Sequence, residues 1–496
     1  MAVLTMARVL SHPRTAELVS TLVENTFVRK LVVKALEHEV YKRAIVDNPG
    51  NRLRRAQEDK FYIVRSMILA LDRAFRDNLI SPQIWGKIFK VFVGNIFVDD
   101  TEWRDSFVAR HGQGSAPPAF LTISPGKRCN LQCVGCYAGS TAANAEKLEY
   151  DIVSRIIQEK TEKWASHFTV ISGGEPLMWR SQGKGILDLA REHRDNYFLM
   201  YTNGTLIDEK VAEEMAELGN ISPAISVEGF RKETEERRGK GVYERILRAC
   251  RNLREVGVPF GISVTATRYN ADLVTSDEFM DFYFLEQGAL YAWIFQYMPI
   301  GRSYTLDLLV TPEQRLRMYR REQHLIRERG FWVADFWNSG PVSDGCISAG
   351  RTGGYLYIEW NGNITPCVFF PYAVDNIKDV YARGDDLDSV LDAPLFKAIR
   401  RWQNGYCYLR SSGERIGNEI TPCPIRDHYR VAYTLIKKFG GRPIDKEAEE
   451  ALQDLEYFQG MVAYDEEVKK LLDKVWEEEY LAPEHKAKVS LAEAAG

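Results

Sequence analysis

Six short apolar runs, rich in β-branched and aromatic residues, alternate with amphipathic stretches in the middle of the chain. The runs are AFLTIS from Ala119, FTVIS from Phe168, YFLMYT from Tyr197, SPAISV from Ser222, FGISVTAT from Phe260 and YAWIFQYM from Tyr291. The stretches between them, such as 151–164 and 243–256, carry apolar residues at helical spacing. Six strand and helix units in series predict an α/β fold with a parallel sheet, either open and doubly wound or a partial barrel. Both arrangements place ligands at the carboxyl ends of the strands.

The pattern differs on both sides of this core. Helical spacing runs from about Thr15 to Phe107, and the following HGQGSAPP has the composition of a linker. From about Tyr304 the alternation is expected to stop, and Asn361-Gly362 predicts a two-residue hairpin turn. A charged helical tail, expected to cover the surface, follows. We therefore predict a helical domain with its linker at 1–118, the core at 119–303, an α+β domain at 304–443 and a helical tail at 444–496.

Composition and charge narrow the class of protein. The 496 residues are 45% hydrophobic and 27% charged, which is ordinary for a folded protein, and the net charge of -4 gives no overall footprint for nucleic acid. No apolar run reaches eighteen residues and the first residues lack a secretory signal, which predicts a cytoplasmic protein. Residues 1–118 hold 18 Lys and Arg against 13 Asp and Glu. This basic part is expected to contact its own acidic domains or, through amphipathic stretches such as 85–98, an anionic membrane surface.

Three cysteines stand together directly after the first predicted strand, in Cys129-Asn-Leu-Gln-Cys133-Val-Gly-Cys136. Eight cysteines in a chain without a secretory signal favour metal or redox chemistry over disulfides. Three thiolates on one loop do not complete a four-cysteine zinc site, but they can bind three irons of a 4Fe-4S cluster and leave the fourth iron open. An open iron can chelate S-adenosylmethionine and pass one electron into its carbon-sulfur bond, which releases a 5'-deoxyadenosyl radical.

The Cys-x3-Cys-x2-Cys spacing after the first strand of an α/β series resembles the radical S-adenosylmethionine (radical SAM) superfamily. The resemblance covers about 119–302 and implies a partial (β/α)6 TIM-like barrel. It implies that S-adenosylmethionine is bound by Gly173, Gly174, Glu175 and Pro176 after the second strand, Asn203 after the third, and Ser226 and Glu228 at the end of the fourth. Physically, glycines let the backbone approach a ligand closely, and a carboxylate can accept hydrogen bonds from a bound ammonium.

One position departs from the family pattern. Many members carry an aromatic residue just before the third cysteine, next to the adenine of the cofactor, whereas this chain has Gly135. The adenine contact is therefore expected to come from elsewhere. Tyr137 is a candidate only because it is close in sequence.

A second set of cysteines follows the core. The spacing of Cys346, Gly362 and Cys367 resembles the entry to the extensions called SPASM and twitch, which hold auxiliary iron-sulfur clusters. Four ligands suffice for one complete 4Fe-4S cluster, so a twitch-like extension is expected, with structural zinc as the alternative. The expected ligands are Cys346, Cys367, Cys407 and Cys423. Cys250 lies among apolar residues of a predicted helix and is expected in the core.

The resemblance implies an enzyme that abstracts hydrogen from a substrate. Members with an auxiliary cluster often oxidise or cross-link peptide side chains, which makes a peptide or protein side chain the leading substrate class. A lipid or another hydrophobic substrate is the alternative, because the order of helical domain, core and cluster domain is similar to that of radical enzymes acting on hydrocarbon chains. A catalytically inactive iron-sulfur or zinc binding module is the alternative outside enzymology. The expected partners are the substrate and an electron donor such as a flavodoxin or ferredoxin, without nucleic acid.

Overall fold

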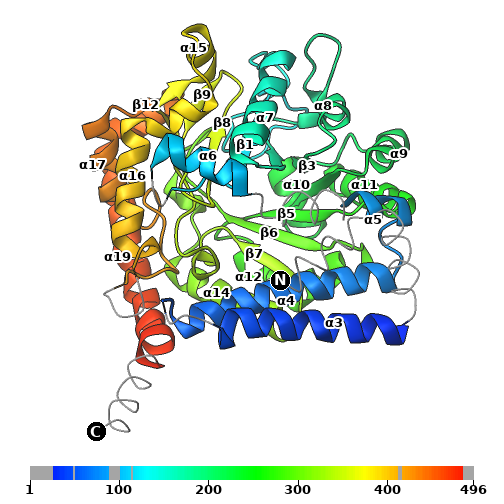
Figure 1. Ribbon diagram of the computed structural model, residues 1–496. Coiled ribbons are helices and arrows are strands. Elements are labelled where there is room, and N and C mark those ends of the chain that lie inside the picture. Colours follow the sequence, from blue (N-terminus) through cyan, green and yellow to red (C-terminus); the bar gives the residue numbers. More distant parts are fainter. Residues whose placement is uncertain (1–25, 48–50, 89–100, 113–114, 411–415, 484–496) are drawn as a thin grey trace, which may run out of the picture.

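The computed structural model describes residues 26–47, 51–88, 101–112, 115–410 and 416–483, and Figure 1 shows how their helices and strands are arranged. Ten strands form one sheet in the order β11-β9-β8-β1-β2-β3-β4-β5-β6-β7. The six predicted strands lie in it in chain order, and each pairs in parallel with the next. Their bounds are β1 Phe120–Ile123, β2 Phe168–Ile171, β3 Tyr197–Thr202, β4 Ile221–Val227, β5 Gly261–Ala266 and β6 Tyr291–Gln296. The predicted α/β class with a parallel sheet is confirmed.

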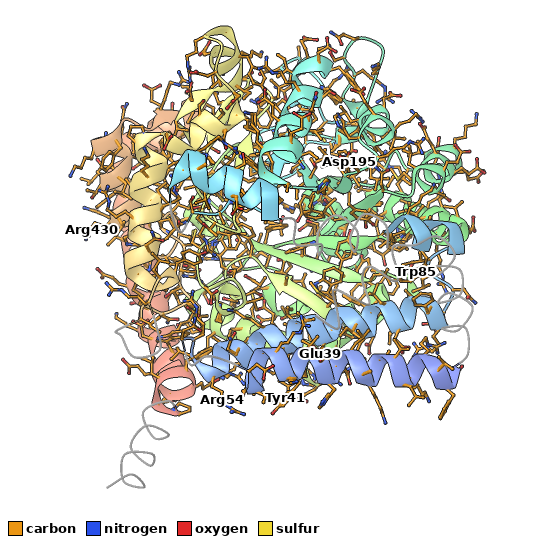
Figure 2. The ribbon with its side chains drawn as sticks, in the orientation of Figure 1. Glu39, Tyr41, Arg54, Trp85, Asp195 and Arg430 are labelled. Carbon is orange, nitrogen blue, oxygen red and sulfur yellow. The ribbon has the colours of Figure 1, made fainter. Side chains whose placement is uncertain are left out.

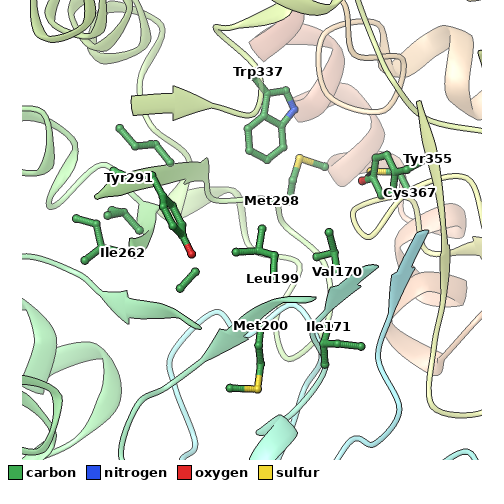
Figure 3. Packing of buried hydrophobic residues seen from close by; sticks show 14 of the residues in the cluster. Val170, Ile171, Leu199, Met200, Ile262, Tyr291, Met298, Trp337, Tyr355 and Cys367 are labelled. Atoms are coloured by element: carbon green, nitrogen blue, oxygen red, sulfur yellow. Dashed lines mark hydrogen bonds between the residues drawn. The ribbon is translucent and has the colours of Figure 1, made fainter. Parts of the chain in front are cut away.

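Neighbouring residues of these strands point to opposite faces of the sheet. Val170 on β2 pairs with Leu199 on β3, and Ile171 pairs with Met200. Figure 3 shows Val170 and Leu199 on the side of Met298, and Ile171 and Met200 on the other side. All four are at most 5% exposed, as expected for a parallel sheet that is covered on both faces.

Helices follow the strands of the core and cover the outer face of the sheet. They are α7 Tyr150–Trp164, α8 Ile186–Glu192, α9 Glu209–Leu218, α10 Arg231–Arg238, α11 Val242–Val256, α12 Ala271–Val274 and α13 Asp277–Asp281. Helix α11 illustrates the packing, because Ile246, Cys250 and Leu253 recur at helical spacing and are completely buried. The helix ends at Gly257, whose φ of +72° favours glycine. Cys250 is thus a core residue, as predicted.

The sheet continues beyond the six predicted strands. Helix α14, Pro312–Arg327, leads into β7, Trp332–Asp335, which pairs in parallel with β6. Strand β8, Tyr355–Ile358, pairs in parallel with β1 at the opposite edge. The expectation that the alternation stops at Tyr304 was therefore wrong by one unit, because the largely charged α14 gives only a weak apolar pattern. The domain boundaries themselves stay predictions.

The hairpin after β8 has a different turn from the one predicted. Strands β9, Asn363–Thr365, and β11, Asp375–Asn376, add antiparallel pairs, while β10, Tyr372–Ala373, pairs with β12, Arg442–Pro443, in a small second sheet. The Gly362 N–H donates to the Glu359 carbonyl at 2.8 Å, so Trp360 and Asn361 form the centre of the turn. The predicted Asn361-Gly362 turn was wrong by one residue, since Gly362, with φ of +91°, takes the bulge position after it.

The amino-terminal region is helical, as predicted. Its helices are α3 Thr26–Tyr41, α4 Arg54–Arg76, α5 Pro82–Ile88 and α6 Thr101–His111. Helices α3 and α4 lie side by side along one end of the molecule, where Figure 2 labels Glu39, Tyr41 and Arg54. Trp85 on α5 stacks on Phe75 of α4 with ring centroids 3.9 Å apart.

Basic residues of this region pair with acidic residues farther along the chain. Lys60 lies 2.7 Å and Arg52 lies 3.4 Å from the Asp344 carboxylate. Arg110 and Asp388 form another pair at 2.7 Å. The expectation that the basic region contacts the chain's own acidic residues is confirmed at these pairs.

The carboxyl-terminal region consists of helices packed beside the sheet. They are α15 Ile377–Ala382, α16 Pro394–Gln403, α17 Tyr429–Phe439, α18 Lys446–Gln453 and α19 Leu455–Val475. The tail was expected to be surface cover, but α19 buries Met461, Val468 and Leu472. Within the described ranges, no helix has both the length and the apolar character that crossing a membrane requires.

Candidate active site

The three cysteines that follow β1 line one cavity inside the barrel, with a volume of about 300 Å³. Cys129 is buried, and Cys133 and Cys136 are half-buried. The loop that carries them lies at the carboxyl end of β1, where ligand sites of parallel α/β folds are found. The sequence prediction that these cysteines come together at one end of the barrel therefore agrees with their geometry.

Two arginines fix the backbone of this loop. The Arg302 Nε donates to the Cys133 carbonyl at 3.1 Å, and the Arg302 N–H donates to the Cys136 carbonyl at 3.0 Å. The Arg237 Nε donates to the Val134 carbonyl at 3.1 Å. These contacts come from the segment after β6 and from α10. No sequence spacing indicates them, because the fold alone brings these segments to the loop.

Gly173 and Gly174 bring the end of β2 into direct contact with the start of the cysteine loop. A Cβ at Gly174 would lie 2.2 Å from the Arg128 carbonyl and 2.4 Å from the Lys127 carbonyl. The Gly174 N–H donates to the Gly126 carbonyl at 2.9 Å. Both glycines also line the cavity. They allow a close approach of backbone to backbone, in addition to the predicted approach to a ligand.

Glu175 is directed at the end of β3. Its carboxylate accepts hydrogen bonds from the Thr202 hydroxyl and the Asn203 N–H, both at 2.8 Å, and from the Leu177 N–H at 3.2 Å. Burial raises the pKa of Glu175, and these bonds oppose the rise. Pro176, also buried, starts a short 3-10 turn. Neither side chain lines the cavity, so a role in binding a ligand ammonium stays a prediction.

Asn203 supports the first cysteine. Its Nδ2 lies 3.7 Å from the Cys129 Sγ and donates to the Asn130 side chain at 2.8 Å. Its Oδ1 accepts from the Thr205 hydroxyl at 2.6 Å. Asn203 lines the cavity as well, so it connects the end of β3 to the cysteine loop.

Tyr297 explains the glycine before the third cysteine, whereas Tyr137 contacts the segment after β2. The Tyr137 hydroxyl forms a hydrogen bond of 2.7 Å with the Ser172 Oγ. It also accepts a hydrogen bond of 3.1 Å from the Gly173 N–H. A Cβ at Gly135 would lie 2.7 Å from the Tyr297 ring, which lines the cavity. The ring of Tyr297 therefore occupies the space that a larger residue at Gly135 would need.

The end of β4 contributes Ser226 to the cavity wall, but Glu228 lies behind it. Glu228 is 1% exposed and accepts hydrogen bonds from Arg237 and Arg238. Arg238 lines the cavity, and its Nη1 lies 3.8 Å from the Cys133 Sγ. Arg238 could not be predicted from the sequence, because no local spacing connects it to the cysteines.

The same cavity extends to residues beside two cysteines of the second set. Ile347 and Val368, the residues after Cys346 and Cys367, both line it. So does Tyr355, whose hydroxyl lies 2.9 Å from the Cys367 Sγ. Figure 3 shows Tyr355 and Cys367 side by side. One cavity thus lies between the cysteine loop after β1 and the residues that surround Cys346 and Cys367.

The fold brings Cys407 to the segment that carries Cys346, because the Cys407 Sγ lies 3.5 Å from the Asp344 carbonyl and a Cβ at Gly345 would lie 2.3 Å from the same sulfur. Burial raises the pKa of the Cys367 thiol to about 12, with a smaller contribution from Cys346. Burial likewise raises the pKa of Cys423, and Cys346 and Cys367 raise it further. Burial and Glu419 raise the pKa of Cys407, to which Cys346 also contributes. Cys346 therefore lies within electrostatic range of the other three.

The cysteine loop after β1 suits an iron-sulfur cluster in its chemistry. Among the residues that the structure describes, no three His, Cys, Asp or Glu side chains are spaced to hold a single metal ion. Three thiols on one loop line the cavity, with the Arg238 guanidinium and the Asn203 amide beside their sulfur atoms. Cysteine sulfur is the usual ligand of such clusters, and hydrogen bonds to sulfur are part of their environment.

Comparisons with known proteins agree with this arrangement. Residues 123–283 match the model of the radical SAM superfamily. The chain is 31% identical over 147 residues to the Fe-coproporphyrin III synthase of Methanosarcina barkeri, covering 29% of this chain and 36% of that protein. It is 27% identical over 264 residues to the sporulation killing factor maturation protein SkfB of Bacillus subtilis, covering 50% of this chain and 60% of that protein. The matches thus span about a third and about three fifths of these relatives.

A solved structure shares the fold. The crystal structure of SuiB of Streptococcus suis bound to the precursor peptide SuiA has a TM-score of 0.51 and 18% identity, covering 79% of this chain and 93% of that chain. A 4Fe-4S cluster and S-adenosylmethionine are the cofactors of this superfamily. The family match therefore assigns residues 123–283 to the radical SAM superfamily of enzymes.

Proposed function

We propose that this enzyme uses a 4Fe-4S cluster held by Cys129, Cys133 and Cys136 to abstract a hydrogen atom from an apolar group in the barrel cavity. A second 4Fe-4S cluster, held by Cys346, Cys367, Cys407 and Cys423, then accepts an electron from the substrate radical. The proposal is carried by one observation: a single cavity is lined by the first three cysteines and by the neighbours of Cys346 and Cys367.

When bound, the first cluster supplies one electron to S-adenosylmethionine, which gives methionine and a 5'-deoxyadenosyl radical. The chain's own residues hold and orient the reactants. Asn203 supports Cys129, and Arg302 fixes the loop backbone at Cys133 and Cys136. Arg238, held by Glu228, presents a cation to the cavity beside Cys133 and suits the carboxylate of the methionine part.

The interior of the cavity favours an uncharged, apolar substrate group. Its deeper walls are formed mainly by aromatic and aliphatic side chains, including Phe120, Phe168, Val170, Leu199, Trp293 and Phe295. The charged side chains of the lining, Arg237 and Arg238, stand at the cofactor end. A charged group placed deeper would lose its hydration without gaining a partner, which is strongly unfavourable.

An apolar side chain of a peptide is the leading substrate in this proposal, and a lipid or other hydrophobic chain is the alternative. The two relatives carry names that refer to a porphyrin and to a killing factor, so their substrates differ. Co-sedimentation of the full chain with anionic and with zwitterionic vesicles distinguishes between the peptide and the lipid hypothesis. Binding that depends on anionic lipid supports the alternative, and its absence at low salt counts against it.

The proposed reaction needs an electron donor at one end of the cavity and an electron acceptor at the other. Transfer of a hydrogen atom would give 5'-deoxyadenosine and a substrate radical. A cluster held by the second set of cysteines would supply an acceptor for one electron from that radical, and water would take the proton. The substrate is thus oxidised by two electrons in all. The initiating electron comes from a low-potential donor of the flavodoxin or ferredoxin class. Tyr355 supports electron transfer from the cavity to the second set of cysteines, because it lines the cavity and its hydroxyl is hydrogen-bonded to the Cys367 sulfur.

Substitution of one cysteine of the second set, with a core cysteine as control, tests the proposal. Full-length protein is reconstituted anaerobically with iron and sulfide, and its iron content, its electron paramagnetic resonance (EPR) spectrum and its 5'-deoxyadenosine formation are measured. Cys367→Ala is expected to lose the second cluster signal and to retain cofactor cleavage. Cys250→Ala, a substitution in the core, is the matched control and is expected to keep both signals. Zinc in place of iron at the second set would contradict the two-cluster proposal.

A further inference from the structure

Arg351 is a buried cation with two nitrogen atoms left unpaired. The residue is 3% exposed, and its Nη2 donates to the Ser343 carbonyl. Its Nε and Nη1 have no hydrogen-bond partner among the described residues. Buried guanidinium groups normally satisfy their donors, because an unpaired buried charge is costly. This arrangement points to an anionic group that would complete the site.

The surroundings of Arg351 narrow the choice of that group. Asp344, the nearby carboxylate, is already paired with Lys60 and Arg52. The guanidinium lies over the Tyr408 ring, 4.0 Å from its centroid. Burial lowers the pKa of Arg351, and Tyr408, Cys346 and Cys407 oppose this shift in that order. The Cys407 Sγ lies 3.5 Å from the Asp344 carbonyl, one residue after the Ser343 carbonyl that accepts from Arg351, so this predicted cluster ligand lies close to the unpaired nitrogens.

We propose that Arg351 is a positioning residue for the second cluster, whose sulfur atoms accept hydrogen bonds from its free N–H groups. This inference rests on the proposed function. A cluster held by four thiolates is anionic and gains one more negative charge on reduction. A fixed cation beside it stabilises the reduced form more than the oxidised form. Arg351 thus raises the reduction potential of the cluster and suits it to accept an electron.

The test measures the reduction potential of the second cluster alone. Full-length protein with Cys129, Cys133 and Cys136 all changed to alanine is reconstituted anaerobically, so that one cluster remains. Its midpoint potential is determined by redox titration followed by EPR, in this background and after Arg351→Met and Arg351→Lys. Arg400→Met is the matched control, because Arg400 is another largely buried arginine of this region and donates to the Ala349 and Leu391 carbonyls.

Arg351→Met is expected to lower the reduction equilibrium constant at least tenfold, which is about 59 mV for a one-electron couple. Arg351→Lys keeps the charge and loses the planar fork, so a smaller shift is expected, and Arg400→Met should cause none. If Arg351→Met does not fold, Arg351→Lys decides the matter by the same titration. An unchanged potential in the Arg351 variants overturns the inference while leaving the proposed function standing. A triple-alanine protein that binds no iron would instead reject the second cluster itself.

Discussion

Gly174 is the residue at which the motif after β2 meets the cysteine loop most closely. Its backbone lies so near to the carbonyls of Lys127 and Arg128 that a Cβ has no room. Since Gly174 has no unusual φ, space alone demands glycine at this position. The position of the cysteines relative to the cofactor motif therefore depends on this contact.

Gly174→Ala is expected to displace the cysteine loop and to lower 5'-deoxyadenosine formation at least tenfold, because a contact of 2.2 Å forces one of the two segments to move. The iron content of the anaerobically reconstituted protein should fall as well. Gly86→Ala on α5 is the control, since its Cβ would meet nothing within 4 Å. Wild-type iron content and turnover in Gly174→Ala would show that this close contact is not needed.

Residues of the active site that belong to sequence motifs could be predicted. Residues that come from segments far away in the sequence could not. Cys129, Gly173 and Asn203 follow strand ends, where a parallel sheet must gather its ligands. Arg238 and Tyr355 reach the cavity only through the packing of α10 and β8, which no local pattern predicts. Tyr297 lies in the sixth predicted run, directly after β6, but the sequence did not predict that its ring fills the space over Gly135.

At the scale of elements, α19 and α17 are joined by a buried carboxylate. The Asp465 Oδ2 on α19 accepts from the Tyr429 N–H at 2.6 Å, and Tyr429 is the first residue of α17. Asp465 thus caps a neighbouring helix rather than its own. Burial, reinforced by Asp427, raises the pKa of Asp465 to about 8.

Asp465→Asn is expected to flatten the dependence of stability on pH. The folded pKa of about 8 lies above the unfolded value of 3.8, so the folded state binds more protons between these values. The wild-type chain should therefore lose stability as pH rises from 5 to 9, on the order of a few kcal/mol. The asparagine variant keeps an acceptor for Tyr429 and does not titrate. Thermal unfolding of both proteins across this range checks the difference, and parallel curves would refute it.

The elements that the sequence predicted are those with clear periodicity. The six core strands and helices α7 and α11 follow their expected ranges closely. Strand β7 was missed because the largely charged helix α14 before it obscures the alternation of strands and helices, and the turn after β8 was misplaced because two turn types share an Asn-Gly pair. Tertiary packing determines the structure of such segments. The same holds for α19, which has a buried face although many of its residues are charged.

On the scale of the whole molecule, the amino-terminal helices are attached to the segment that carries Cys407. Arg52 donates to the carbonyls of Tyr408 at 2.6 Å and Arg410 at 3.2 Å, and it pairs with Asp344. Lys60 on α4 holds the same carboxylate. The sequence predicted a basic amino-terminal region but not this target, because the contact joins segments more than 350 residues apart.

Arg52→Met is expected to loosen this segment and to reduce iron binding at the second set of cysteines, measured in the triple-alanine background. Arg43→Met is the control, since Arg43 is exposed and pairs with Glu39 of the preceding helix. Faster limited proteolysis near Tyr408 should accompany the loss of iron. If Arg52→Met binds iron as well as Arg43→Met does, the amino-terminal helices do not support the second site.

The most direct measurement is the amount of 5'-deoxyadenosine formed by anaerobically reconstituted full-length protein with a strong reductant and S-adenosylmethionine. The account predicts formation by the wild-type chain and by Cys250→Ala, and none by Cys133→Ala. Equal formation by Cys133→Ala and the wild-type chain, or none by a wild-type chain that carries its iron, would contradict it.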